Sequence, residues 1–96
     1  MERRRLSESE IGERLASLPG WEGDATALRK EFRFRDHVAA MGFVTKVALV
    51  AERMNHHPDL RIVYNRVSIA VSTHDAGGVT DVDVALAREI ERCLEP

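Results

Sequence analysis

Hydrophobic positions recur with two different periods along this chain, and the changes of period divide it into short elements. The first apolar stripe has helical spacing and consists of Ile11, Leu15 and Leu18. Ser7 and Glu10 precede it in the spacing of a capping box, in which each side chain bonds the other residue's backbone N–H group. The pattern therefore predicts a helix that begins after Ser7 and that Pro19-Gly20 stops.

A period of two replaces the helical period in the next segment. Trp21-Glu22 is consistent with a short strand, with Gly23-Asp24 as its turn. After this turn, Leu28, Phe32 and Phe34 alternate with Arg29, Glu31 and Arg33. Such alternation is typical of a strand with one buried face and one solvated face.

The longest helical pattern follows Asp36, which is a candidate N-cap. Its apolar stripe consists of Val38, Met41, Val44, Val47, Ala48 and Ala51. Pro58 disfavours helical geometry at the residue before it, His57. We therefore expect this helix to end between Met54 and His56.

Two more strand patterns flank Asn65-Arg66, which we interpret as a two-residue hairpin turn. This turn pairs Tyr64 with Val67, Ile62 with Ile69, and Leu60 with Val71. All six side chains would then share one buried face. The opposite face would be small and polar, suited to a groove or a subunit contact, and consists of Arg61, Val63, Ser68, Ala70, Ser72 and His74.

A glycine-containing loop at residues 75–78 leads to the last helix. Thr80 with Asp83 is a second capping-box match, and the stripe of this helix consists of Leu86, Ile90 and Leu94. The element order is α-β-β-α-β-β-α. It predicts an α+β fold with a four-stranded antiparallel sheet and helices packed on one face.

Length and composition restrict the class of protein. The 96 residues suit a single domain over positions 1–96, and 44% hydrophobic residues is ordinary for a globular fold. The net charge of −2 gives no electrostatic footprint for nucleic acid. The arginine run at residues 3–5 is followed at once by glutamates, so we interpret it as a solvated terminus rather than a binding arm.

The expected location is the cytoplasm. The single cysteine, Cys93, forms no internal disulfide, so nothing argues for an oxidising compartment. No apolar run resembles a signal peptide or approaches the length of a membrane span. We therefore expect neither a membrane nor a nucleic-acid partner.

Histidines are the residues best suited to chemistry, and the chain has four of them. His37 lies at the start of the long helix and is expected to face solvent. His56 and His57 are consecutive, so their rings point in different directions and a shared metal is disfavoured. Taken alone, two histidines at a helix C-terminus are typical of capping.

His74 changes this interpretation because the hairpin folds its strand back toward the residues after Pro58. Asp83 is first interpreted as a cap, which is compatible with lining a site, and Glu52 and Tyr64 complete the polar group. Imidazoles exist in both protonation states near neutral pH, so one can act as a general acid and another as a base. Such a pair suits loss or addition of water. No covalent nucleophile and no phosphate-binding glycine loop is indicated.

The spacing of these residues resembles the signature of the pterin-4a-carbinolamine dehydratase family. The matching positions are Glu52, His56, His57, Pro58, Tyr64, His74 and Asp83. Segments 41–48, 63–67, 72–74 and 77–80 also look like that family, and the resemblance spans roughly residues 18–92. Leu60 departs from it, since many members carry an aromatic residue there. That position is expected on the buried face, so the change concerns packing more than chemistry.

The resemblance implies a hydro-lyase that converts 4a-hydroxytetrahydropterin to quinonoid dihydropterin and water, in recycling of the tetrahydrobiopterin cofactor. It implies no metal or organic cofactor. His56, His57 and His74 would form the catalytic set, with His56 and His74 as the acid-base pair and His57 chiefly holding the pterin. The supporting residues would be Glu52, Pro58 and Asp83. Which histidine is the acid and which is the base stays open.

The resemblance also implies a homodimer or homotetramer and a functional link to an aromatic amino acid hydroxylase. Some animal members are dimerisation partners of a transcription factor, although no residue here argues for that role. One alternative is a non-catalytic pterin-binding or dimerisation module, which the intact histidine set disfavours. A metal site at His56, His74 and Asp83 is the other, and no recognisable ligand spacing supports it.

Overall fold

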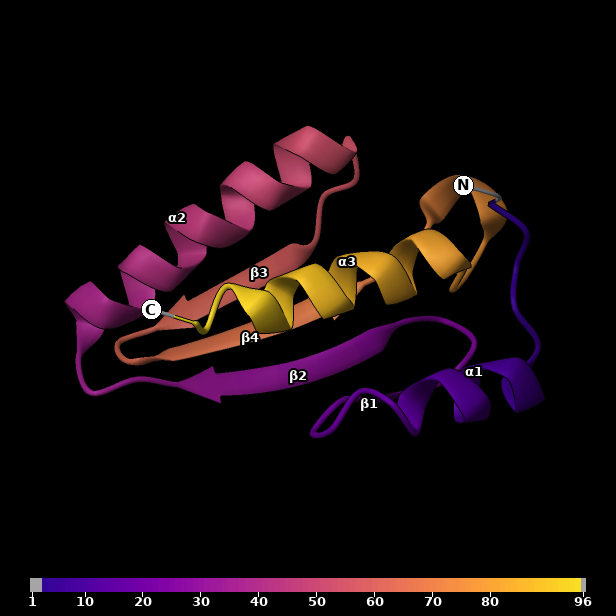
Figure 1. Ribbon diagram of the computed structural model, residues 1–96, viewed down its shortest axis with the longest axis horizontal. Coiled ribbons are helices and arrows are strands. Elements are labelled where there is room, and N and C mark those ends of the chain that lie inside the picture. Colours follow the sequence, from indigo (N-terminus) through magenta and orange to yellow (C-terminus); the bar gives the residue numbers. More distant parts are fainter. Residues whose placement is uncertain (1–2, 96) are drawn as a thin grey trace.

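Three helices cover one face of a four-stranded sheet in the computed structural model, which describes residues 3–95 (Figure 1). The elements are α1 (Glu8–Leu15), β1 (Glu22–Gly23), β2 (Leu28–Arg33), α2 (His37–Met54), β3 (Asp59–Val63), β4 (Arg66–Val71), a short 3-10 turn η1 (His74–Ala76) and α3 (Asp81–Arg92). The strand order is β1-β2-β4-β3, and every neighbouring pair is antiparallel. The predicted α+β fold is therefore confirmed.

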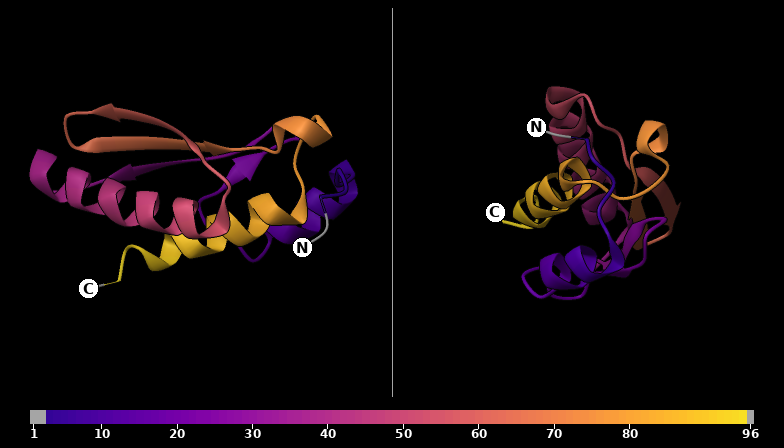
Figure 2. Two further views of the ribbon diagram at one scale, coloured as in Figure 1. Left: turned by 90° about the horizontal axis from the view of Figure 1, so that it is seen from above. Right: turned by 90° about the vertical axis from the view of Figure 1, so that its right-hand side faces the viewer.

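The helices lie on one side of the sheet, and no described element covers the other side (Figure 2). Alternating residues of β2 and β4 form the dry face, and they are Leu28, Phe32, Val67, Ile69 and Val71. These side chains pack against buried residues of the helices, which include Ile11, Val47, Leu86 and Ile90. The period of two in the sequence thus separates the core from the open face.

Helix ends follow the capping signals. Both capping boxes form, with Ser7 and Glu10 starting α1 and Thr80 and Asp83 starting α3. The Asp36 side chain accepts the backbone N–H of Ala39 at the start of α2. At its other end α2 stops after Met54, where Asn55 adopts a left-handed conformation with φ of 51°.

The hairpin prediction was wrong in its register. Leu60 pairs with Ile69 and Ile62 with Val67, so the two turn residues are Tyr64 and Asn65. Two hydrogen bonds with the backbone of Phe34 hold the turn in place. The Asn65 side-chain amide donates to the Phe34 carbonyl, and the Phe34 N–H donates to the Asn65 carbonyl. Tyr64 is consequently 67% exposed, away from the buried face. The strand pairing is shifted by two residues from the predicted one. Because side chains alternate with a period of two, this even shift leaves the other side chains on their expected faces.

The buried stripe of α2 also differs from the prediction. Ala40, Phe43, Val47 and Ala51 face the core. The Phe43 ring centroid lies 4.9 Å from those of both Phe32 and Phe34, and these aromatic contacts set the rotation of the helix. Val38 and Met41 are therefore 77% and 39% exposed, and Ala48 is also exposed. Within residues 3–95, no helix has both the length and the apolar character needed to cross a bilayer.

Candidate active site

Three chain segments meet at the end of the sheet where α2 finishes (Figure 1). The turn after α2 carries His56 and His57, and the His56 backbone N–H still bonds to the Ala51 carbonyl at 3.1 Å. The segment after β4 carries Thr73 and His74, with Thr73 bridged to Gly78 across the loop. The first turn of α3 supplies Asp83.

A buried ion-pair geometry joins two of these segments. The Nε2 atom of His56 lies 2.6 Å from Oδ1 of Asp83. Asp83 is fully buried and His56 is 8% exposed. A buried carboxylate requires partners for both oxygens. The Asp83 side chain therefore both caps α3, as the capping box predicted, and orients an imidazole.

The second oxygen of Asp83 is also saturated. Oδ2 accepts the backbone N–H of Thr80 at 2.9 Å and the hydroxyl of Thr73 at 2.8 Å. Because Thr73 donates to Asp83, Thr80 donates its own hydroxyl to Thr73 across 2.8 Å. Among the described residues, no buried side-chain polar atom lacks a partner. Such a satisfied network holds the carboxylate, and through it the ring of His56, in one orientation.

The partners of His56 determine its tautomer. An ionised carboxylate only accepts hydrogen bonds, so the proton of the neutral ring is on Nε2. The other ring nitrogen, Nδ1, lies 3.4 Å from Nη1 of Arg3, and a guanidinium only donates. Both contacts thus favour the tautomer that carries its proton on Nε2 and keeps the lone pair on Nδ1.

His57 points in another direction from His56, as expected for consecutive residues. Its Nε2 lies 2.8 Å from Oε1 of Glu52, one helical turn back on α2. The two side chains are 56% and 79% exposed. Exposed ion pairs add little stability, about 0 to 1 kcal/mol, so this contact orients the ring more than it stabilises the fold.

A pocket of about 300 Å³ brings the three predicted histidines together. Its lining consists of Arg3, Asn55, His56, His57, Ser72, Thr73, His74 and Asp75. His74 is exposed, and its ring forms no hydrogen bond with another described residue. Pro58 and Glu52 lie beside the lining in sequence without belonging to it. Tyr64, placed with this group by the sequence analysis, lies instead in the β3–β4 turn.

Comparison with known proteins gives the same family as the motif. The sequence model described as "Pterin 4 alpha carbinolamine dehydratase" matches residues 4–93. The chain belongs to this family. A relative from Acidobacterium capsulatum is 52% identical over 93% of this chain and 97% of its own, and one from Sulfurisphaera tokodaii is 45% identical over 95% and 98%. The names of both assign them provisionally to the pterin-4-alpha-carbinolamine dehydratases.

Solved structures of similar chains support the pterin dehydratase fold. A Brucella melitensis protein described as a transcriptional coactivator/pterin dehydratase is 39% identical, with a TM-score of 0.90 over 94% of this chain and 98% of its own. A pterin dehydratase-like RuBisCO assembly factor of the alpha-carboxysome is 18% identical, with a TM-score of 0.65 over 78% and 87%. The second likeness concerns the fold alone.

Two residues that contact the Asp83–His56 pair were not predicted from the sequence. Thr73 is buried and donates to Asp83, and its position directly before His74 is the only local signal for it. Arg3 belongs to the arginine run that we had interpreted as a solvated terminus. That interpretation is incomplete, because Arg3 lines the pocket and contacts His56. No local pattern predicts this contact, since 53 positions separate the two residues.

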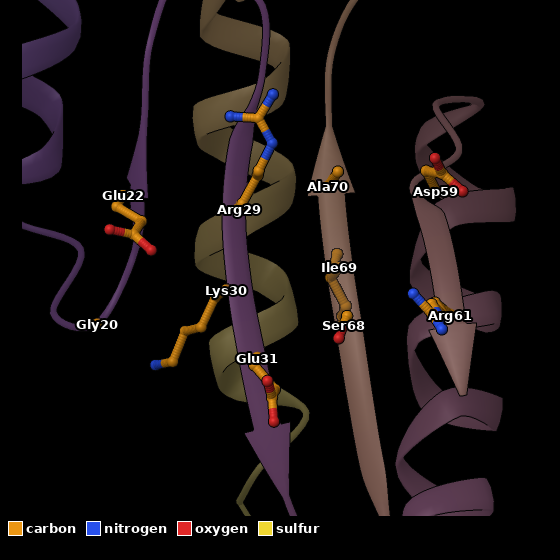
Figure 3. A pocket seen from close by; sticks show the side chains of 10 residues that line it. All are labelled: Gly20, Glu22, Arg29, Lys30, Glu31, Asp59, Arg61, Ser68, Ile69 and Ala70. Atoms are coloured by element: carbon orange, nitrogen blue, oxygen red, sulfur yellow. The ribbon is translucent and has the colours of Figure 1, made fainter. Parts of the chain in front are cut away.

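A larger hollow of about 520 Å³ lies elsewhere, on the open face of the sheet (Figure 3). Arg29 and Glu31 project into it from β2, Ser68 from β4, and Asp59 and Arg61 from β3. The groove predicted on this polar face is therefore present. Its lining carries both acidic and basic side chains and no histidine, whereas three histidines line the smaller pocket.

The single cysteine lies away from the pocket. Cys93 follows α3 at the end opposite Asp83, and roughly 15 Å of helix separates the two. Burial raises the pKa of its thiol, which donates to the carbonyl of Glu89. In the part of the chain that the structure describes, no group of three or more histidine, cysteine or acidic residues could hold a metal ion.

Proposed function

We propose that this protein dehydrates 4a-hydroxytetrahydropterin to quinonoid dihydropterin and water by histidine general acid-base catalysis. The observation that carries the proposal is the buried Asp83–His56 pair, which occupies Nε2 of the ring and leaves Nδ1 without a carboxylate partner in the pocket that His74 also lines. One imidazole is oriented and the other is unrestrained. Two such groups in one pocket are what a dehydration requires, because one proton must be removed and another supplied.

The two environments divide the roles between the histidines. Nδ1 of His56 accepts the proton from N5 of the carbinolamine, and the buried carboxylate of Asp83 stabilises the imidazolium that forms. His74, in its protonated form, gives a proton to the 4a-hydroxyl. The C4a–O bond then breaks, water leaves, and a C4a=N5 double bond forms. The proton taken by His56 and the proton lost by His74 balance through solvent.

His57 is assigned to substrate binding. Its ring is exposed at the pocket and oriented by Glu52, so it offers a directed polar contact to the pterin edge. Glu52 contacts His57 and not His56, which separates its supporting role from that of Asp83. Pro58, half-buried after His57, directs the chain from the turn into β3.

A dehydration assay tests the proposal directly. Purified protein is added to enzymatically generated 4a-carbinolamine, and formation of the quinonoid product is followed against the spontaneous reaction. Acceleration proportional to protein concentration is expected. A rate equal to the spontaneous one, with the pterin still bound, would instead support a non-catalytic pterin-binding module on the same fold.

Self-association is the second part of the proposal, and α2 supplies the surface. Val38 and Leu49 are 77% and 67% exposed and lie about three turns apart on one helical line, beside Met41. Exposed apolar side chains aligned in this way mark a protein contact. A second copy of this chain is the partner that the dimeric or tetrameric family implies.

Leu49→Glu is expected to convert the oligomer to a monomer, because a carboxylate buried in an apolar contact loses its hydration. Light scattering coupled to size exclusion measures the mass. Ser9→Glu adds the same charge at an exposed position of α1 and should leave the mass unchanged. A wild-type chain that is already monomeric at micromolar concentration would refute the contact.

A further inference from the structure

Three consecutive arginines of the N-terminal segment have three different partners, and the segment itself is held against the body of the protein. Leu6 is 2% exposed, and its backbone N–H donates to the carbonyl of Val79 at 2.8 Å. Residues 3–7 therefore lie beside the loop that leads into α3, next to the pocket.

Two of the arginines anchor this segment. Arg4 donates to both oxygens of Glu10, at 3.1 and 2.8 Å. The Arg4 guanidinium, with the Ser7 backbone N–H, lowers the pKa of Glu10 to about 2, so this carboxylate stays charged across the neutral range. Arg5 packs against Gly78, where an added Cβ would collide with the carbonyl oxygen of Ala25 and lie 3.1 Å from Nε of Arg5. The close approach requires glycine.

The third arginine reaches the catalytic candidate. Nη1 of Arg3 lies 3.4 Å from Nδ1 of His56, the nitrogen that Asp83 leaves unoccupied. The charged and titratable groups around the His56 ring are Asp83 at Nε2, Arg3 at Nδ1, and His57, His74 and Asp75 along the pocket wall. Because a guanidinium only donates hydrogen bonds, the Arg3 contact requires the lone pair of Nδ1, and it pairs with the ring whose proton lies on Nε2 beside Asp83.

We propose that Arg3 is a positioning residue of this pocket, which keeps Nδ1 of His56 unprotonated in the empty site and donates to a substrate oxygen once the substrate occupies Nδ1. The first half depends only on the charges around the ring. The second half rests on the proposed function, since a pterin carries a carbonyl and a hydroxyl oxygen close to the reacting nitrogen. The donors of Arg3 match either oxygen.

The first test measures the titration of His56 by NMR in the substrate-free protein. Arg3→Gln removes the charge but keeps a polar side chain, and it should raise the measured His56 pKa by about half a pH unit, with a smaller rise for Arg3→Lys, which keeps a cation. Arg35→Gln, at the opposite end of α2, makes the same change in net charge and should have no effect. Added salt should shrink the difference. An unchanged His56 titration in Arg3→Gln would overturn the inference.

The second test uses the reaction. With Arg3→Gln, the acid limb of the kcat/KM profile should move to higher pH by the same half unit, and KM for the carbinolamine should rise about five- to tenfold with the lost hydrogen bond. A shifted titration with an unchanged KM would limit Arg3 to the empty site and refute the substrate contact. A shifted titration in a protein without dehydratase activity would leave the Arg3–His56 pairing standing and refute the proposed function. Normal dehydratase turnover together with an unshifted His56 titration in Arg3→Gln would leave the proposed function standing and refute the role of Arg3.

Discussion

Replacing His56 by alanine is expected to lower kcat for carbinolamine dehydration by on the order of 10²-fold or more, and His74→Ala should have an effect of the same order. Each change removes one of the two proposed proton-transfer groups in the pocket, whereas the proposed substrate contact of His57 is retained. Steady-state kinetics on purified variants measures the loss, and circular dichroism verifies that each variant is folded.

The matched control for these variants is His37→Ala. His37 is exposed at the start of α2, and its ring contacts the backbone carbonyl of Tyr64 at 2.7 Å, at the other end of the helix from the pocket. Its loss should leave kcat unchanged. His56→Gln retains a donor toward Asp83 and separates the loss of the base from the loss of a buried partner. Wild-type turnover in both His56→Ala and His74→Ala would refute the acid-base assignment.

Asp83→Asn is the second large change, with an expected fall in kcat of about 10³-fold, comparable to the tautomer effect in other His-Asp pairs. The asparagine oxygen can still accept from Thr80 and Thr73, which leaves the amide NH₂ facing Nε2 of His56. The imidazole must then carry its proton on Nδ1, and it can no longer act as a base toward the pocket. Nitrogen chemical shifts of the ring report the tautomer directly. A wild-type tautomer with full activity would contradict this role.

Asp83→Ala separates the structural role of this residue from the chemical one. It leaves the Thr80 N–H, the Thr73 hydroxyl and the His56 ring without their buried acceptor. The free energy of unfolding should fall by about 3 to 5 kcal/mol, measured by urea denaturation. Asp81→Ala, at a half-buried position of the same helix start, is the control and should cost far less.

Local signals predicted most of the fold. Capping boxes specify helix starts because they depend on residues three positions apart, and both boxes form as predicted. The hairpin register was harder to predict from the sequence, because a shift of two residues leaves the alternation of side chains unchanged. The rotation of α2 was also missed, because apolar residues occur on two of its faces. Only contact of Phe43 with Phe32 and Phe34 decides which face is buried.

Some residues of the pocket were likewise predicted from the sequence, whereas others were found only in the structure. Its histidines and Asp83 were predicted from their spacing and its resemblance to a family pattern, and the structure brings them to one end of the sheet. Their catalytic roles remain predictions. Thr73 and Arg3 were accessible only in three dimensions, because their contacts join segments that no sequence period connects.

The sequence by itself determined the order of elements, the face each strand buries, and the identity of the groups that can move protons. These properties depend on near neighbours along the chain. The tertiary structure decided which nitrogen of His56 is available, because that depends on Asp83 at one side of the ring and Arg3 at the other. Folding brings these two charges from 27 residues after His56 and 53 residues before it to a single imidazole.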